Sequence, residues 1–371
     1  MEIKTLSFVP AVPFNDTLET FFDSYKVDKD IECYQLFFSP YGDATNFDDL
    51  DQIKFNSEIV ILNIIDSLID LDDQLRIDKL KQFCENNPEQ KFIIFNFHFN
   101  LKRNLSIPNL YLDTIWSIDF EQKLIPCEKE NLSNNWICLN SGTKLHRVMI
   151  TSYLLSKDYC NNGSFTFQVG APTLTRYDKY RNLTKMKDDF RKDLSKGFAK
   201  FKSKDFNQLE VVAYDNDVYT FASNYNNNLL PVYKNFALEI VTGTMFFEST
   251  PLLSEKEIQS VYAKNFPIYM NGVGMAKEMK KFFDIDIFED IIDHSYDDVE
   301  DHFDRIFTAI NKNQHLLDGS TNIREMWYDN EKRFEENCNK MDSLFYDKKY
   351  KIEINHNKIK KALSHFNVTV K

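Results

Sequence analysis

Phe236-Ala-Leu-Glu-Ile-Val-Thr-Gly243 and Phe266-Pro-Ile-Tyr-Met270 are two short apolar runs, separated by a helix-like segment at 254–265. Short apolar runs of this kind are typical of buried strands. A strand, a helix and a second strand in this order predict a parallel pair joined by a crossover helix. The second run continues into Asn271-Gly-Val-Gly274, where the glycines permit a tight turn or a close approach of the backbone to a ligand.

The same alternation of apolar runs and helical patterns extends along the whole chain. In the first part, strands are predicted at 31–38, 58–64, 91–97 and 111–118, and a helix at 68–84. In the second part, further strands are predicted at 136–140 and 164–169, and helices at 143–157, 181–202, 274–283, 298–313 and 320–345. This pattern predicts an α/β fold with two Rossmann-like domains, an interdomain cleft and C-terminal helices.

A polar stretch at 128–135 is the best candidate for a linker between the two parts. We therefore place a first domain at 1–132 and a second at 133–345. The basic residues at 346–371 are expected to form a C-terminal tail, most simply a solvated helix.

Composition and charge restrict the kind of protein that the chain can be. Its 371 residues are 43% hydrophobic, which is enough for two domains with sizeable cores. We see no apolar run of transmembrane length, no signal peptide and no metal-binding spacing among the six cysteines. A reduced protein of the cytoplasm, or of the host cytoplasm if viral, is therefore expected.

Charge is unevenly distributed along the chain. Residues 1–130 hold 12 Lys and Arg against 24 Asp and Glu, whereas residues 141–205 hold 14 against 6. Anionic ligands should prefer the basic segment as one wall of the cleft. The acidic first part argues against broad nucleic-acid binding by that domain.

Ser254-Glu-Lys256 stands at the predicted start of the helix between the two strands, and two interpretations of it are open. A Ser followed by an acid is ordinary capping chemistry, and this is the more common of the two. The tripeptide also suits a nucleotide-sugar site. A carboxylate can take both hydroxyls of a ribose, an ammonium can neutralise a diphosphate, and the helix N-terminus adds N–H donors.

The segment from Phe246 to Lys256, with Phe266-Pro-Ile-Tyr-Met-Asn-Gly272 after it, resembles the donor half of two-domain (GT-B-type) glycosyltransferases. The run 282–297, and the blocks 136–140 and 144–147, are similar to blocks in phage and bacterial proteins assigned to that class. Together these blocks cover roughly 136–310. The chain departs from the group at Gly243, where the group tends to carry a Glu, and this bears on how the donor sugar is held.

The resemblance implies a nucleotide-sugar site in the second domain. Its residues would be Asn140, Lys144, His146, Arg147, Glu248, Ser254, Glu255, Lys256 and Gly272. Lys144 and Arg147 fall near the start of the 143–157 helix, where a cation opposes the helix dipole unless an anion is bound. We interpret both as diphosphate ligands and His146 as a donor to phosphate, with solvated surface charge as the alternative.

His98, which follows the strand predicted at 91–97, is the candidate catalytic base. Ligands of α/β sheets bind at the carboxyl ends of the strands, and a histidine there can take a proton from an acceptor hydroxyl. A histidine in a surface loop or at the edge of the core is the more common identity of such a residue.

Two acidic runs imitate a metal site. Asp70-Leu-Asp-Asp73 falls in a predicted helix, where side chains two residues apart point to different sides, and Asp284-Ile-Asp286 alternates with apolar residues as in a strand. We therefore expect no bound metal and no cofactor, with the nucleotide-diphosphate sugar as a substrate.

The sequence thus predicts a metal-independent hexosyl- or pentosyltransferase that moves a sugar from a nucleotide-diphosphate sugar to a hydroxyl acceptor bound by the first domain. The acceptor would be a glycan or a modified DNA base. One alternative is a transferase acting on hydroxymethylated bases of viral DNA, favoured by the phage resemblance and the basic segment 181–204 but opposed by the acidic first part. The other is a non-catalytic binding protein on a glycosyltransferase scaffold, favoured by Gly243.

Overall fold

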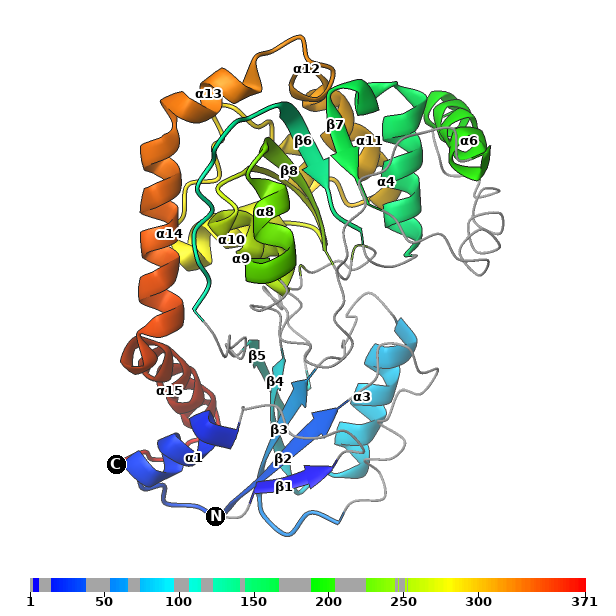
Figure 1. Cartoon of the computed structure of the whole chain (residues 1–371). Helices are drawn as coiled ribbons and strands as arrows, with labels where there is room; N and C mark the ends of the chain where they lie inside the picture. The colour runs from blue at the N-terminus through cyan, green and yellow to red at the C-terminus, as the bar shows by residue number, and fades with distance from the viewer. Residues whose placement is uncertain are drawn as a thin grey trace. The chain divides into compact units, whose positions relative to one another are not determined.

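The computed structural model describes residues 3–6, 15–37, 54–65, 74–96, 107–114, 123–140, 144–166, 188–203, 225–243, 246, 251 and 253–371. The chain forms two compact units (Figure 1). The first unit consists of 1–119, 248–253 and 344–371, and the second of 120–247 and 254–343. These limits differ from the predicted domains mainly at the C-terminus, which belongs to the first unit.

The first unit contains a sheet of five parallel strands in the order β1-β2-β3-β4-β5. The strands are β1 (Ile3–Leu6), β2 (Ile31–Phe37), β3 (Ile59–Ile65), β4 (Lys91–Asn96) and β5 (Leu110–Thr114). The last four lie where the apolar runs predict strands. Because their interior residues are apolar on both faces, this sheet needs cover on both sides.

Helices supply that cover. α3 (Gln74–Asn86) packs through Leu80 and Phe83 on one face. α1 (Asn15–Ser24) and α15 (Lys348–His365) lie on the other face, where Phe21 and Leu363 join the same apolar cluster. The helix predicted at 68–84 corresponds to α3, whereas β1 and α1 were not predicted.

The C-terminal residues are not a separate solvated tail, and this expectation was wrong. α15 buries Ile359 and Leu363 against the first sheet. Its polar residues also contact α1: His356 Nε2 lies 3.3 Å from Thr20 Oγ1, and the Lys360 ammonium lies 3.8 Å from the Tyr25 ring centroid. α15 therefore carries an apolar face as well as its lysines, and the lysine content alone did not indicate that face.

The second unit contains four parallel strands in the order β7-β6-β8-β9. They are β6 (Asn134–Cys138), β7 (Gly163–Phe165), β8 (Phe236–Thr242) and β9 (Phe266–Met270). β8 and β9 are buried along their whole length, as the two apolar runs predict. The coarse α/β class with parallel sheets is therefore confirmed.

The helices of the second unit are α4 (Leu145–Ser156), α6 (Asp188–Ser203), α8 (Leu230–Tyr233), α9 (Glu255–Tyr262), α10 (Met275–Phe283), α11 (His302–Lys312), α12 (Gln314–Leu317), α13 (Ile323–Asp329) and α14 (Glu331–Tyr346), which continues into the first unit. Short 3₁₀ turns occupy Tyr159–Asn161 and Ser295–Asp298, and a π-helix Tyr225–Leu229. α6 packs on α4 and buries Phe190, Leu194, Phe198 and Phe201.

The prediction of a single helix at 320–345 was wrong, because the helix is interrupted at Asn330, between α13 and α14. Asn330 ends α13 with backbone angles of φ −114° and ψ 9°. Its side-chain amide donates to Met326 O at 2.8 Å, and this local bond competes with continuation of the helix.

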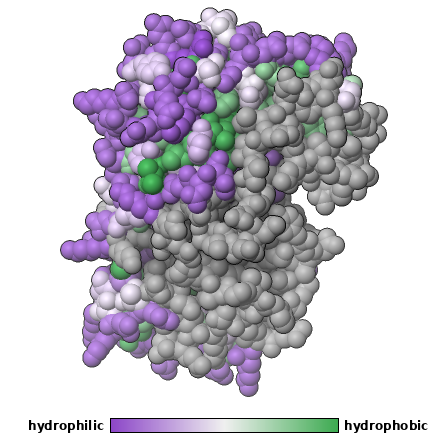
Figure 2. Space-filling view, viewed as in Figure 1, coloured by the Kyte–Doolittle hydropathy of each residue, from purple (hydrophilic) through white to green (hydrophobic). Residues whose placement is uncertain are grey.

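The described surface is largely hydrophilic in the view of Figure 2. Ile125 and Tyr328 are the large apolar side chains that are exposed in the described part of the chain. Within those residues we find no helix that is both long and apolar enough to span a bilayer.

Candidate functional site

The strand order of the second sheet reverses between β6 and β8. The chain passes from β6 to β7 on one side, and then to β8 on the other side of β6. In open parallel sheets such a reversal opens a crevice at the carboxyl ends of the two strands, and ligands bind there. The strands described in the first sheet follow one another in chain order, so they contain no such reversal.

Asn140 lies just past the end of β6 and links the strands on both sides of it. Its Oδ1 accepts a hydrogen bond from Thr242 Oγ1 at 2.8 Å, at the last residue of β8. Its backbone N–H donates to Thr166 Oγ1, just past β7. Asn140 is 1% exposed, so in this arrangement it holds the ends of three strands together.

His146 and Arg147, in the first turn of α4, reach the end of β8. His146 Nε2 donates to Gly243 O at 3.0 Å, and Arg147 Nη2 donates to Thr242 O at 3.3 Å. Burial, with the Arg147 charge next in importance, holds the pKa of His146 well below its usual value. The imidazole is therefore neutral, and its one N–H is directed at Gly243 rather than at a phosphate.

The His146 ring stacks on the Phe246 ring, which in turn contacts the Arg305 guanidinium. The His146 ring lies 5.2 Å from the Phe246 ring at an interplanar angle of 17°. The guanidinium of Arg305, from α11, lies 4.6 Å from the same Phe246 ring, and its Nη2 donates to Phe246 O at 2.7 Å. This packing fixes the first turn of α4 against the segment that follows β8.

Gly243 occupies a position with no room for a side chain. A Cβ atom there would lie 2.3 Å from Asn271 Nδ2 and 2.9 Å from Glu257 Oε1. Asn271, just past β9, donates from that Nδ2 to Glu257 Oε1 at 2.7 Å, and its Oδ1 accepts from Gly272 N at 2.6 Å. Any larger side chain at position 243 would therefore require the Asn271 amide to move.

Ser254 begins α9 with a complete capping box. Its Oγ accepts from Lys256 N, and the carboxylate of Glu257 accepts from Ser254 N at 2.9 Å and from Ser254 Oγ at 2.6 Å. Ser254 is 6% exposed. The capping interpretation of this serine is therefore the one that the geometry favours.

Glu255 and Lys256 form an ion pair in the first turn of α9, with side chains 18% and 22% exposed. Burial alone would raise the pKa of Glu255, but Lys256, the backbone N–H and the Arg147 charge together lower it. Glu255 is therefore an ionised carboxylate within electrostatic reach of Arg147.

Three helices of the second unit begin near the carboxyl edge of its sheet, and they differ in how their N-termini are capped. The box of Ser254 and Glu257 caps α9. The buried carboxylate of Asp297 accepts from Lys277 N at 3.1 Å at the start of α10. α4 has Lys144 at its N-cap without a side-chain cap bond, and no acidic residue in its first turn. Of these three helices, α4 is thus the one with neither a side-chain cap bond nor an acidic residue in its first turn.

The other predicted residues divide into two groups. Lys144 is partly exposed at the N-cap of α4, and Gly272 is buried in the turn after β9. His98 and Glu248 lie outside the described residues.

Four residues of this edge were not predicted from the sequence: Thr242, Glu257, Asn271 and Asp297. The Ser-x-x-Glu pattern of 254–257 signals Glu257, whereas the cap from Asp297 has no local signal.

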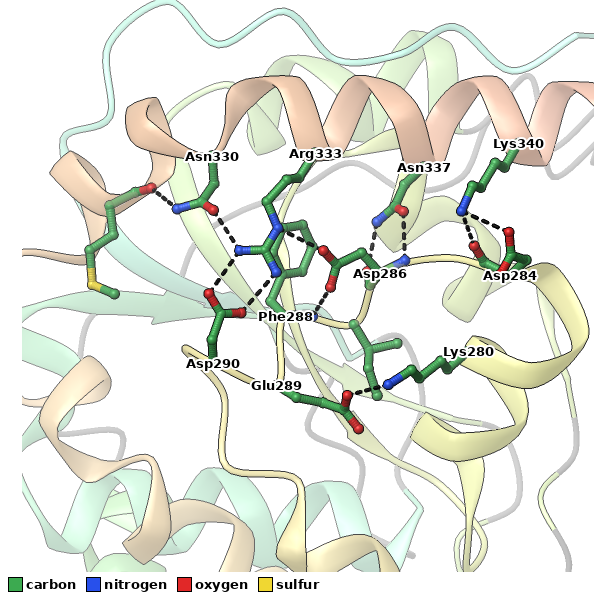
Figure 3. A network of polar contacts seen from close by, with 12 residues as sticks. Lys280, Asp284, Asp286, Phe288, Glu289, Asp290, Asn330, Arg333, Asn337 and Lys340 are labelled. Carbon is green, nitrogen blue, oxygen red and sulfur yellow. Dashed lines mark hydrogen bonds and ion pairs between the residues drawn. The ribbon is translucent and has the colours of Figure 1, made fainter.

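The acidic run Asp284-Ile-Asp286 lies in a loop that α14 holds, as Figure 3 shows. Arg333 Nε donates to Asp286 Oδ2 at 2.6 Å and grips Asp290 through both terminal nitrogens at 2.9 and 2.8 Å. Lys340 pairs with Asp284 Oδ2 at 2.8 Å. No group of three or more potential metal ligands occurs among the residues that the structure describes.

Comparisons with protein-family models, with curated proteins and with solved structures found no match.

Proposed function

We propose that the second unit binds the diphosphate of a nucleotide sugar at the reversal between β6 and β8, and that the protein is a glycosyltransferase acting on a hydroxyl acceptor. The observation that carries this proposal is the N-terminus of α4 at that reversal, which has Lys144 at its N-cap, Arg147 in its first turn and no acidic residue in that turn. A helix N-terminus and a nearby cation together form an arrangement that suits an anion.

The diphosphate would lie against α4 rather than α9 or α10, because carboxylates already satisfy the N-termini of those two helices. Lys144 would contact it directly. Arg147 contributes a positive charge at the same edge, while its Nη2 contacts the end of β8. Asn140 and His146 then act by holding the strand ends and α4 in place, since both are buried and bonded to β8.

Glu255 and Lys256 would contact the rest of the nucleotide. An ionised carboxylate can accept hydrogen bonds from both hydroxyls of a ribose, and Glu255 is kept ionised by its neighbours. Binding would separate the Glu255–Lys256 ion pair, which frees the Lys256 ammonium for a phosphate oxygen. Both side chains are largely buried, so the contacts with the nucleotide must replace this ion pair when it separates.

In the reaction, the bond between the anomeric carbon and the diphosphate oxygen breaks, and a bond from the acceptor oxygen to that carbon forms. The acceptor hydroxyl loses its proton to a base, and negative charge develops on the leaving diphosphate. Lys144, Lys256 and the N–H groups of α4 would stabilise that charge, which is electrostatic catalysis at the group where charge appears.

The basic helix α6 gives the viral-DNA alternative little support. Lys196 Nζ donates to Ser156 O at 2.9 Å, and Lys200 Nζ donates to Leu155 O at 3.2 Å. Both lysines thus bind the carbonyl end of α4, where cations complement the helix dipole. Their charge is engaged within the protein.

A thermal-shift panel of nucleotides and nucleotide sugars tests the donor site. A ligand at about 100 times its Kd adds about 2.7 kcal/mol, a midpoint shift of several degrees for a chain of this size. The shift should be lost in Glu255→Ala and reduced in Lys144→Ala. Glu331→Ala and Lys332→Ala, at exposed positions of α14, are the matched controls and should keep it.

No shift with any nucleotide would refute the donor site. Release of free nucleoside diphosphate with a glycan or a hydroxymethylated DNA acceptor would support transfer and identify the acceptor class. Tight binding without release for every acceptor would instead favour the non-catalytic binding protein.

A further inference from the structure

Glu257 lies in the first turn of α9, and its two carboxylate oxygens accept from different residues. Oε2 accepts from Ser254 N at 2.9 Å and from Ser254 Oγ at 2.6 Å, as part of the capping box. Oε1 accepts from Asn271 Nδ2 at 2.7 Å. The Glu257 side chain is fully buried, so these bonds replace the water that a carboxylate would otherwise hold. One carboxylate therefore connects the start of α9 to the residue that follows β9.

Asn271 is itself held in one orientation. A backbone N–H can only donate, so the bond from Gly272 N at 2.6 Å fixes the side-chain oxygen and directs Nδ2 toward Glu257. On another side, Gly243 approaches so closely that a Cβ there would lie 2.3 Å from Nδ2. Asn271 is 1% exposed, so its amide cannot rotate away without breaking a buried hydrogen bond.

Glu255 and Lys256 occupy the two positions between Ser254 and Glu257. A helix of eight residues is marginal by itself, so the geometry of its first turn depends on the cap. A shift of the Glu257 carboxylate would move this turn and the backbone from which both side chains project. Because binding residues must be held within about 0.5 Å of the productive geometry, such a shift would weaken a ligand bound there.

We propose that Asn271 is a positioning residue of the nucleotide site, which acts through Glu257 to hold Glu255 and Lys256 in the orientation that binds the nucleotide. This role rests on the proposed function. It requires an amide, because one end must donate to a carboxylate while the other accepts from the Gly272 N–H. An aspartate at the same position would direct a second carboxylate at Glu257.

Titration calorimetry with UDP, GDP, ADP and CDP measures nucleotide affinity, at a temperature where circular dichroism shows each protein to be folded. For a nucleotide that binds the wild type, we expect Asn271→Ala to raise the Kd by about tenfold, as is typical when the partner of a binding residue is lost. Asn313→Ala is the matched control. Asn313 is also buried and donates to Asp293 O and Ala309 O at 3.0 Å, but it lies at the C-cap of α11, so its loss should leave the Kd unchanged.

Asn271→Asp separates positioning from general destabilisation, because its effect should depend on pH. Two carboxyl groups at the present separation of 2.7 Å can share one proton, which keeps the bond, but they repel each other when both ionise. Burial already raises the pKa of Glu257. Lys256 of the same helix, Glu239 of β8 and Tyr269 of β9 are also near this carboxylate, and the wild type contains all three. The ratio of the variant Kd to the wild-type Kd should therefore rise from about pH 5 to about pH 9.

The outcomes distinguish this role from the donor site itself. If the wild type binds none of the four nucleotides, the donor site is refuted, and this role with it. If the wild type binds but Asn271→Ala binds equally well, the donor site stands and the positioning role is overturned. The role is also overturned if Asn313→Ala weakens binding as much as Asn271→Ala, or if the Kd ratio of Asn271→Asp does not change with pH. Should Asn271→Ala fail to fold, the pH dependence of Asn271→Asp decides alone.

Discussion

Replacing Gly243 with alanine tests the closest packing at the proposed site. The added Cβ would lie 2.3 Å from Nδ2 and 2.6 Å from Cγ of Asn271, so the amide must move by about 1 Å to reach an ordinary contact distance. That amide donates to Glu257 and accepts from Gly272 N. Its displacement therefore breaks at least one bond in a buried network.

The expected cost has two parts. Overpacking in a filled interior costs about 1–3 kcal/mol. A buried carboxylate that loses one of its donors costs about 1–3 kcal/mol more. We expect Gly243→Ala to lower the free energy of unfolding by about 2–6 kcal/mol and the thermal midpoint by at least about 4 °C.

Thermal unfolding followed by circular dichroism, with a double-mutant cycle, measures this cost. Asn271→Ala removes the obstructing amide, so Gly243→Ala should cost much less in that background. Gly274→Ala is the matched control. A Cβ there meets nothing within 4 Å, but φ is +87°, so its cost is backbone strain that Asn271→Ala does not relieve.

A Gly243→Ala protein that melts within about 1 °C of the wild type, or whose destabilisation is the same with and without the Asn271 side chain, would contradict this prediction.

Three further predictions concern the supporting structure. Because burial raises the pKa of Glu239 from 4.5 to about 8, its stabilising contribution is complete below pH 4.5 and is lost as the pH rises to about 8. At about 1.36 kcal/mol per pH unit this is at most about 5 kcal/mol, and urea unfolding from pH 5 to 8 should show a shallower decline for Glu239→Gln. Asp301 caps α11 through Phe303 N and Asp304 N, so Asp301→Ala should cost about 1 kcal/mol in the same assay, and an unchanged value would count against that cap. Arg333→Lys keeps the charge but loses the fork to Asp290, so it should destabilise by about 1 kcal/mol or more, whereas equal stability would show that charge alone holds the loop.

Much of the fold could be predicted from the spacing of apolar residues, because a buried face of a helix or strand requires apolar residues at regular intervals in the sequence. The strands β2–β6, β8 and β9 and the inward face of α6 were predictable for this reason. β1 spans only four residues, and the break at Asn330 depends on one side-chain amide. α15 was misjudged because its lysines dominate the composition, while only its tertiary partners show which face is apolar.

The site was less predictable than the fold. The tripeptide 254–256 and the His146–Arg147 pair were found from the sequence, and the structure brings them to the carboxyl ends of β8 and β6. The strand order that makes this edge a candidate site depends on long-range pairing, which no local pattern encodes. The same is true of Asn271 against Gly243 and of Asp297 at α10.

The different caps of α9 and α10 also bear on the order in which these helices can form. Ser254 and Glu257 lie at α9's own N-terminus, so the cap of that helix is complete as soon as its residues leave the ribosome, although eight residues alone are marginal as a helix. α10 receives its carboxylate from Asp297, 20 residues beyond Lys277. An isolated helix of nine residues is marginal in water, so α10 should remain unformed until the chain to Asp297 has been made and has folded back.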